Sequence, residues 1–452
     1  MGSIDQYVFL IGASLVVIVS YLFGVISKRT NIPSVLMLIA LGVVLHLGFD
    51  QLQLEVEGIV PLLKVLGVIG LIMIVLEAAL DLKLEREKWG LIWKSFSVAL
   101  LALVAQTFVI AFVFQLIFEI ELLIAMAYAI PLAIMSSAIV LPSVDGLKEE
   151  KKEFMIYEAT FSDILGIIFF YSLLENLEVT NTKEVLVGVS GNILLTIAVS
   201  IVLSYALAYI FHRLVSGIKL FLLISVLILL YAIGKQFHLS SLIIILTFGL
   251  VMNNYRLFFP GRMTKWFKEK EMKEVLEDLH LITGETAFVV RTFFFVVFGI
   301  SISLATLLDM EVVVVSCVLI LAMYLIRGVF LRIFRGGKIF PEIYISPRGL
   351  ITILLFYTIT QQSFYQDELY AEISGILLFV IIVSSLIMTI ALVRNGKMKK
   401  AEVELEIVGG SIDLEGEDLS QMSGPGTEDT VSEKGSSNVD ETSDPEGSKP
   451  DQ

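Results

Sequence analysis

The sequence predicts an all-α protein that crosses a membrane many times and ends in a disordered acidic tail. Of the 452 residues, 56% are hydrophobic and only 17% are charged. A water-soluble domain needs more charge than this to cover its surface. Runs of about 20 apolar residues, each long enough to cross the ~30 Å hydrocarbon core of a bilayer as a helix, recur along residues 7–393. The alternative, a set of very long buried core helices in a soluble protein, fits this composition poorly.

These runs predict about thirteen transmembrane helices. We expect them at 7–27, 32–49, 58–81, 91–117, 121–143, 154–174, 184–211, 218–234, 239–254, 285–307, 311–331, 347–362 and 370–393. The first run lacks a basic leader, so we expect a retained helix and not a cleaved signal peptide.

Lysine and arginine alternate between the connections and predict an orientation. They gather after spans one, three, five, seven, nine, eleven and thirteen, whereas the other connections hold only Lys183 and Lys235 together with acidic groups. By the positive-inside rule, the N-terminus lies outside and the C-terminus is cytoplasmic. The long basic segment 255–284 is expected to be an amphipathic cytoplasmic helix.

The last residues differ in composition from the rest of the chain. Residues 401–452 contain 15 Asp and Glu against Lys434 and Lys449 and are rich in Ser, Gly, Thr and Pro. Such a segment buries too little apolar surface to fold alone. We therefore predict a transmembrane domain over residues 1–395 and a cytoplasmic, disordered acidic tail over 396–452. This tail is either simply solvated or regulatory.

Two carboxylates lie inside the sixth predicted span, where an ionisable group costs several kcal/mol and indicates a function. At 1.5 Å per residue, Glu158 lies roughly 6 Å and Asp163 roughly 14 Å from the cytoplasmic end. Five residues rotate a helix by about 500°, so the two side chains point about 140° apart. They therefore serve different roles.

Other charged residues in the spans are candidate partners. Arg327 is expected at the depth of Glu158, so the two predict a buried structural ion pair, with snorkelling of Arg327 as the alternative. Arg291 is either a second partner of Glu158 or a residue whose side chain snorkels to the membrane surface. Glu77 either lines a cytoplasmic funnel to Asp163 or is solvated at the interface.

Helix-breaking residues recur in two spans. The fifth span contains Pro131, Ser136, Ser137 and Pro142, and the twelfth opens with residues 346–349, Ser-Pro-Arg-Gly. Prolines free backbone carbonyls, and broken backbone in a membrane faces protein or a water-filled cavity. If spans 1–6 and 8–13 are two halves joined by span 7, the fifth and the twelfth span are each the fifth helix of their half. This is typical of a secondary transporter with two inverted six-helix repeats and interrupted crossing helices.

Taken together, these motifs resemble the monovalent cation–proton antiporter family, in particular its sodium/proton exchanger branch. They are Glu158-x4-Asp163, Arg327, Glu77-Ala-Ala-Leu-Asp81, Arg291 to Gly299, and Ser346-Pro347-Arg348-Gly349. The resemblance covers about residues 7–395. The chain departs from the family by having Ser162 before the aspartate and Ser136-Ser137 in the fifth span. The serine pair is closer to the potassium/proton branch.

The resemblance implies that Asp163 alternately binds a monovalent cation and a proton. Oxygen ligands are expected from Ser162, Ser136, Ser137 and freed carbonyls, because hard cations prefer oxygen, while Glu77 approaches the ion path. Arg291 and Arg348 are secondary candidates. The family also implies a homodimeric, multi-pass protein of the cell membrane.

The predicted function is exchange of Na+ for H+, with K+/H+ exchange as the alternative and Li+ as a further possible substrate. Because Ser162 cannot hold a second proton, we predict electroneutral one-for-one exchange. No cofactor, no metal beyond the transported cation and no nucleic acid is expected.

Two other classes fit the sequence less well. A channel needs a continuous polar path, and most spans show almost no polar stripe. An intramembrane enzyme needs a nucleophile–base pair or a metal site, and the four histidines, at positions 46, 212, 238 and 280, lie near span ends or in loops. The sequence therefore indicates a transporter and not an enzyme.

Overall fold

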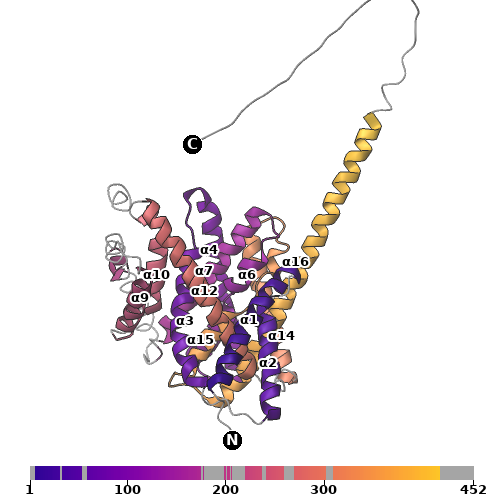
Figure 1. Cartoon of the computed structure of the whole chain (residues 1–452). Helices are drawn as coiled ribbons and strands as arrows, with labels where there is room; N and C mark the ends of the chain where they lie inside the picture. The colour runs from indigo at the N-terminus through magenta and orange to yellow at the C-terminus, as the bar shows by residue number, and fades with distance from the viewer. Residues whose placement is uncertain are drawn as a thin grey trace, which may run out of the picture. The chain divides into compact units, whose positions relative to one another are not determined.

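The computed structural model shows a helical protein (Figure 1). It describes residues 6–30, 33–52, 59–174, 177, 198–199, 201–203, 205, 219–236, 241–258, 269–301 and 309–417. Throughout these residues every regular element is a helix, so the prediction of an all-α fold is confirmed. The chain divides into two units, residues 1–396 and 397–452, and the first unit holds the features described below.

The helices, with two short 3-10 turns, follow one another in this order: α1 (Gln6–Thr30), α2 (Ser34–Leu52), α3 (Ile59–Asp81), η1 (Arg86–Lys88), α4 (Trp89–Phe118), α5 (Leu122–Ala133), α6 (Ser137–Ser143), α7 (Glu149–Leu174), α9 (Lys219–Gln236), α10 (Ser241–Asn253), α11 (Tyr255–Phe258), α12 (Glu269–Ser301), α14 (Met310–Phe334), η3 (Glu342–Tyr344), α15 (Leu350–Ile359) and α16 (Asp367–Glu417).

Within the described residues, seven stretches are long and apolar enough to cross a membrane. They are Leu10–Ser27, Arg86–Phe118, Leu122–Ser143, Glu149–Leu174, Leu276–Ile300, Met310–Phe334 and Asp367–Gly396. Shorter apolar helices accompany them at Ser34–Phe49, Ile224–Gly234, Ser241–Asn253 and Leu350–Ile359. The total of thirteen and the inverted repeats remain predictions. Most of the expected span 184–211 lies outside the described residues.

One expected boundary is wrong. The sequence predicted a cytoplasmic helix within 255–284 and a separate span at 285–307, but α12 is continuous from Glu269 to Ser301. No proline occurs between these residues, so nothing interrupts the hydrogen-bond ladder where the charged face gives way to apolar residues. The charged and the membrane-spanning parts are therefore one helix.

Two groups of helices surround the site. α4 packs against α5, α7 and α14, while α12 packs against α2 and α3. The contact of α2 with α12 is a close approach of backbones, since a Cβ on Gly42 would lie 2.8 Å from Gly299 Cα. A glycine at both positions is what permits this distance.

Candidate cation and proton site

The fifth expected span is interrupted between its two prolines. α5 ends at Ala133 and α6 begins at Ser137, with Ile134 and Ser136 in extended conformation. The break lies at 134–136 because backbone groups there find partners on other elements. Met135 N donates to Ser162 Oγ (2.9 Å), and Ser136 N donates to Pro347 O (2.9 Å).

The second interruption lies beside the first. Residues 345–349 precede α15 and belong to no helix, and their Pro347 carbonyl accepts the Ser136 amide. A Cβ on Gly349 would lie 2.8 Å from Ser136 Oγ and 2.7 Å from Ile139 Cδ1. A side chain at position 349 would therefore have to displace these two side chains, and glycine permits the contact between the two broken segments.

Asp163 lies next to this crossing, on α7. Its side chain is buried, and its Oδ2 accepts a hydrogen bond from Ser137 N at 3.0 Å. The first amides of a helix have no partner within the helix, so Asp163 satisfies one of them at the start of α6. Its other oxygen, Oδ1, is buried and has no hydrogen-bond partner among the described residues.

The three candidate serines have different surroundings. Ser162 Oγ is used as the acceptor for Met135 N. Ser136 Oγ is buried without a hydrogen-bond partner in the described part of the chain. Ser137 lines the same cavity as Asp163, whereas Ser136 and Ser162 are not among the residues that line it.

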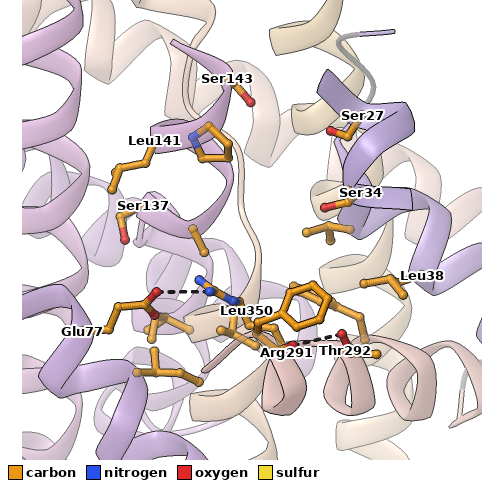
Figure 2. Close-up of a pocket in the computed structure, with 18 of the residues that line it drawn as sticks. Ser27, Ser34, Leu38, Glu77, Ser137, Leu141, Ser143, Arg291, Thr292 and Leu350 are labelled. Carbon is orange, nitrogen blue, oxygen red and sulfur yellow. Dashed lines mark hydrogen bonds and ion pairs between the residues drawn. The ribbon is translucent and has the colours of Figure 1, made fainter. Parts of the chain in front are cut away.

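A cavity of about 940 Å³ leads to Asp163. Figure 2 shows Ser137 and Leu141 on one side of it and Ser34 and Leu38 on the other. Residues 145–146, in the connection from α6 to α7, also line it.

Glu77 and Arg291 meet in this cavity (Figure 2), with Arg291 Nη2 at 3.1 Å from Glu77 Oε1. Arg291 is thus neither a partner of Glu158 nor a snorkelling residue, because its side chain, 24% exposed, is directed to Glu77. Glu77 lines the same cavity as Asp163, and its place on the ion path stays a prediction.

The structure brings together the expected pair of Glu158 and Arg327. Their side chains are 1% and 3% exposed. Arg327 Nη2 lies 2.9 Å from Glu158 Oε2, Nη1 contacts Oε1, and Nη2 also donates to Glu342 O (3.0 Å). Two parallel hydrogen bonds give this pair the fork geometry typical of arginine with a carboxylate.

Arg348 is fully buried at the end of α5. Its Nε donates to Leu132 O (2.8 Å) and its Nη1 to Ser346 O (2.6 Å). Leu132 lies in the last turn of α5, where carbonyls lack helical partners. Arg348 therefore stabilises the C-terminal end of α5, and Asp163 stabilises the N-terminal end of α6 on the other side of the break.

Two polar residues near the site were not identified from the sequence. Gln106, buried in α4, accepts from Arg348, and the buried Glu342 binds Lys151 (2.7 Å) and Arg335. A side-chain amide in the middle of an apolar helix is a signal for Gln106, whereas Glu342 lies in a connection and gives none.

A membrane protein in which two interrupted helices cross beside a buried carboxylate belongs to the class of secondary transporters. Residues 14–394 match the family model described as "Sodium/hydrogen exchanger, transmembrane". The chain belongs to this family, and its activity is the exchange of Na+ for H+ across a membrane. The predicted family is confirmed, and the K+ alternative is not favoured.

Solved structures share the fold. The sodium proton antiporter MjNhaP1 of Methanocaldococcus jannaschii at pH 8 is 16% identical with a TM-score of 0.65, covering 85% of this chain and 100% of that chain. A second structure of that antiporter, from an electron-microscopy map, is 18% identical with a TM-score of 0.59, covering 86% of this chain and 95% of that one. No curated protein sequence matches the chain.

Proposed function

We propose that Asp163 is the group that binds Na+ and H+ in alternation. The supporting observation is the difference between its two oxygens. Oδ1 is buried without a hydrogen-bond partner among the described residues, whereas Oδ2 accepts a hydrogen bond from Ser137 N. An ionised carboxylate in a low-dielectric site is costly without a counter-ion. A proton or a cation at Oδ1 removes that cost.

Oxygen atoms around Asp163 supply the remaining ligands. Ser136 Oγ is the best candidate, because it is buried at the crossing without a hydrogen-bond partner in the described residues. Ser137 lines the cavity, and Ser162 Oγ keeps a lone pair beside its bond to Met135 N. These donors suit Na+, a hard cation that prefers oxygen.

The exchange is electroneutral, with one Na+ moved for one H+. Asp163 carries a single charge, and the residue before it, Ser162, has no carboxyl group that could bind a second proton. Glu77 is already compensated by Arg291 at 3.1 Å. Occupation of Asp163 by either ion leaves the site neutral, and the charged, empty site is too costly to carry across the membrane.

Glu158 and Arg327 act as a structural pair that fastens α7 to α14. We also propose the cell membrane as the location, with an external N-terminus and a cytoplasmic C-terminus, and a homodimer as the assembly. The apolar residues exposed on α1, among them Tyr7, Leu10 and Ile11, offer a surface to lipid or to a second copy.

The test uses proteoliposomes with an imposed pH gradient, to which Na+, Li+ or K+ is added. Wild-type protein is expected to dissipate the gradient with Na+, and Asp163→Asn is expected to abolish this flux. Asp309→Asn is the matched control, since Asp309 is an exposed residue that caps α14 and asparagine also caps helices.

Unchanged activity of Asp163→Asn would refute the assignment of the site. A rate that depends on a clamped membrane potential would refute one-for-one exchange. Cation flux that persists after the pH gradient has collapsed would indicate a channel instead.

A further inference from the structure

Gln106 makes hydrogen bonds at both ends of its amide, inside the apolar helix α4. Its side chain is 3% exposed. Arg348 Nη2 donates to Gln106 Oε1 at 2.8 Å, and Gln106 Nε2 donates to Met323 O at 3.1 Å. The amide therefore joins α4 to the segment before α15 and to α14.

Each of the two residues that bind Gln106 is itself linked to a residue at the proposed site. Arg348 binds the last carbonyls of α5, Leu132 O at 2.8 Å and Ala133 O at 3.5 Å. The segment that follows them places the Ser137 amide on Asp163. On the other side, Met323 O is the carbonyl that accepts the Arg327 amide in an α-helix, because Arg327 lies four residues later. Gln106 thus connects the helix break and the turn that carries Arg327.

Arg348 is a buried cation that is held by neutral acceptors, so each of its hydrogen bonds matters for its position. In the described residues, no carboxylate lies within 4.0 Å of its guanidinium. Its neutral acceptors are carbonyls, the Ser346 hydroxyl and the Gln106 amide. Gln106 is the acceptor that does not belong to the broken segments, so it holds the guanidinium from outside them.

We propose that Gln106 is a positioning residue for the cation site, acting through Arg348. It keeps the guanidinium on the carbonyl end of α5, and so fixes the break after which the Ser137 amide binds Asp163. Without this acceptor the end of α5 is held less firmly, and the Ser137 amide no longer keeps Asp163 in position for Na+. This inference rests on the proposed role of Asp163.

The test is the Na+ dependence of exchange in proteoliposomes. Gln106→Leu removes the acceptor, and we expect the Na+ concentration at half-maximal rate to rise at least about fivefold, with a smaller change in maximal rate. Gln106→Glu keeps an acceptor and gives Arg348 a carboxylate, so its half-saturating concentration is expected to stay within about twofold of wild type.

Two further variants separate positioning from general destabilisation. Gln115→Leu makes the same change nine residues later in α4 and is expected to behave as wild type. If Gln106 acts through Arg348, adding Gln106→Leu to Arg348→Gln changes nothing further, because the coupled effects are not additive.

A wild-type Na+ dependence in folded Gln106→Leu would overturn the proposal, as would an equal defect in Gln106→Glu. If Gln106→Leu fails to fold, Gln106→Asn takes its place, because the shorter amide withdraws the acceptor from Arg348; a wild-type Na+ dependence in Gln106→Asn would then overturn the proposal. Failure of the proposed function would appear separately, as Na+ exchange that survives Asp163→Asn.

Discussion

Buried charges around the crossing are compensated in three different ways. Glu158 and Arg327 neutralise each other directly. Arg348 is surrounded by backbone carbonyls and one amide. Asp163 has one satisfied oxygen and one without a partner in the described residues. The group whose hydrogen bonds are incomplete is the one expected to bind a transported ion.

Removal of one partner from the Glu158–Arg327 pair should destabilise the protein. Glu158→Gln leaves a buried cation with weaker acceptors, and the loss of a partner in a buried pair costs about 3–5 kcal/mol. We expect a large drop in thermal stability in detergent. The double variant Glu158→Leu with Arg327→Met should recover part of it, and a double variant as unstable as Glu158→Gln would contradict the structural role.

Arg291→Gln should change cation affinity and not stability. It leaves Glu77 in the cavity without its counter-ion, so an additional negative charge would face the path to Asp163. We expect the half-saturating Na+ concentration to fall severalfold at alkaline pH. Combining Arg291→Gln with Glu77→Gln should restore the wild-type value, and an unchanged Na+ dependence in Arg291→Gln would exclude this electrostatic effect.

The interrupted helices show how far an element can be predicted from sequence. Pro131 and Pro142 indicated a broken span, but the break itself lies at 134–136. Its position depends on Ser162, Asp163 and Pro347, which lie far away in the sequence. Local residues therefore predict that a helix is interrupted, and partners distant in the sequence decide at which residues the interruption lies.

Substitution of Gly349 tests the contact between the two broken elements. A Cβ there would meet Ser136 Oγ and Ile139 Cδ1 below 3.0 Å, and overpacking costs about 1–3 kcal/mol. Gly349→Ala should lower the melting temperature and slow exchange. Gly48→Ala is the control, since nothing lies within 4 Å of its new Cβ; equal effects of the two variants would argue against a tight crossing.

On the scale of the whole molecule, composition, charge alternation and short motifs were sufficient to predict the helical membrane fold and the family. The contacts between individual charged side chains were harder to predict. The shared depth of Glu158 and Arg327 indicated their contact, whereas the Glu77–Arg291 contact joins helices whose packing the sequence does not show. Arg348 was identified as a candidate, but its carbonyl partners required the three-dimensional crossing.

We expect exchange to require movement of the two sides of the cavity relative to each other. Leu141 and Ser34 line opposite sides (Figure 2). Leu141→Cys with Ser34→Cys, in a Cys317→Ser background, should therefore be inactivated by a bifunctional thiol reagent that spans them. Inactivation should require both cysteines and should reverse on cleavage of the linker. Full activity of the cross-linked protein would exclude this relative movement.

The glycine contact between α2 and α12 restricts which wall can move. At Gly42 and Gly299 the backbones meet with no side chain between them, so neither helix can slide past the other without steric overlap. Ser34 and Arg291, which both line the cavity, are carried by these two helices. We therefore expect α2 and α12 to move together as one unit when the two sides of the cavity shift relative to each other.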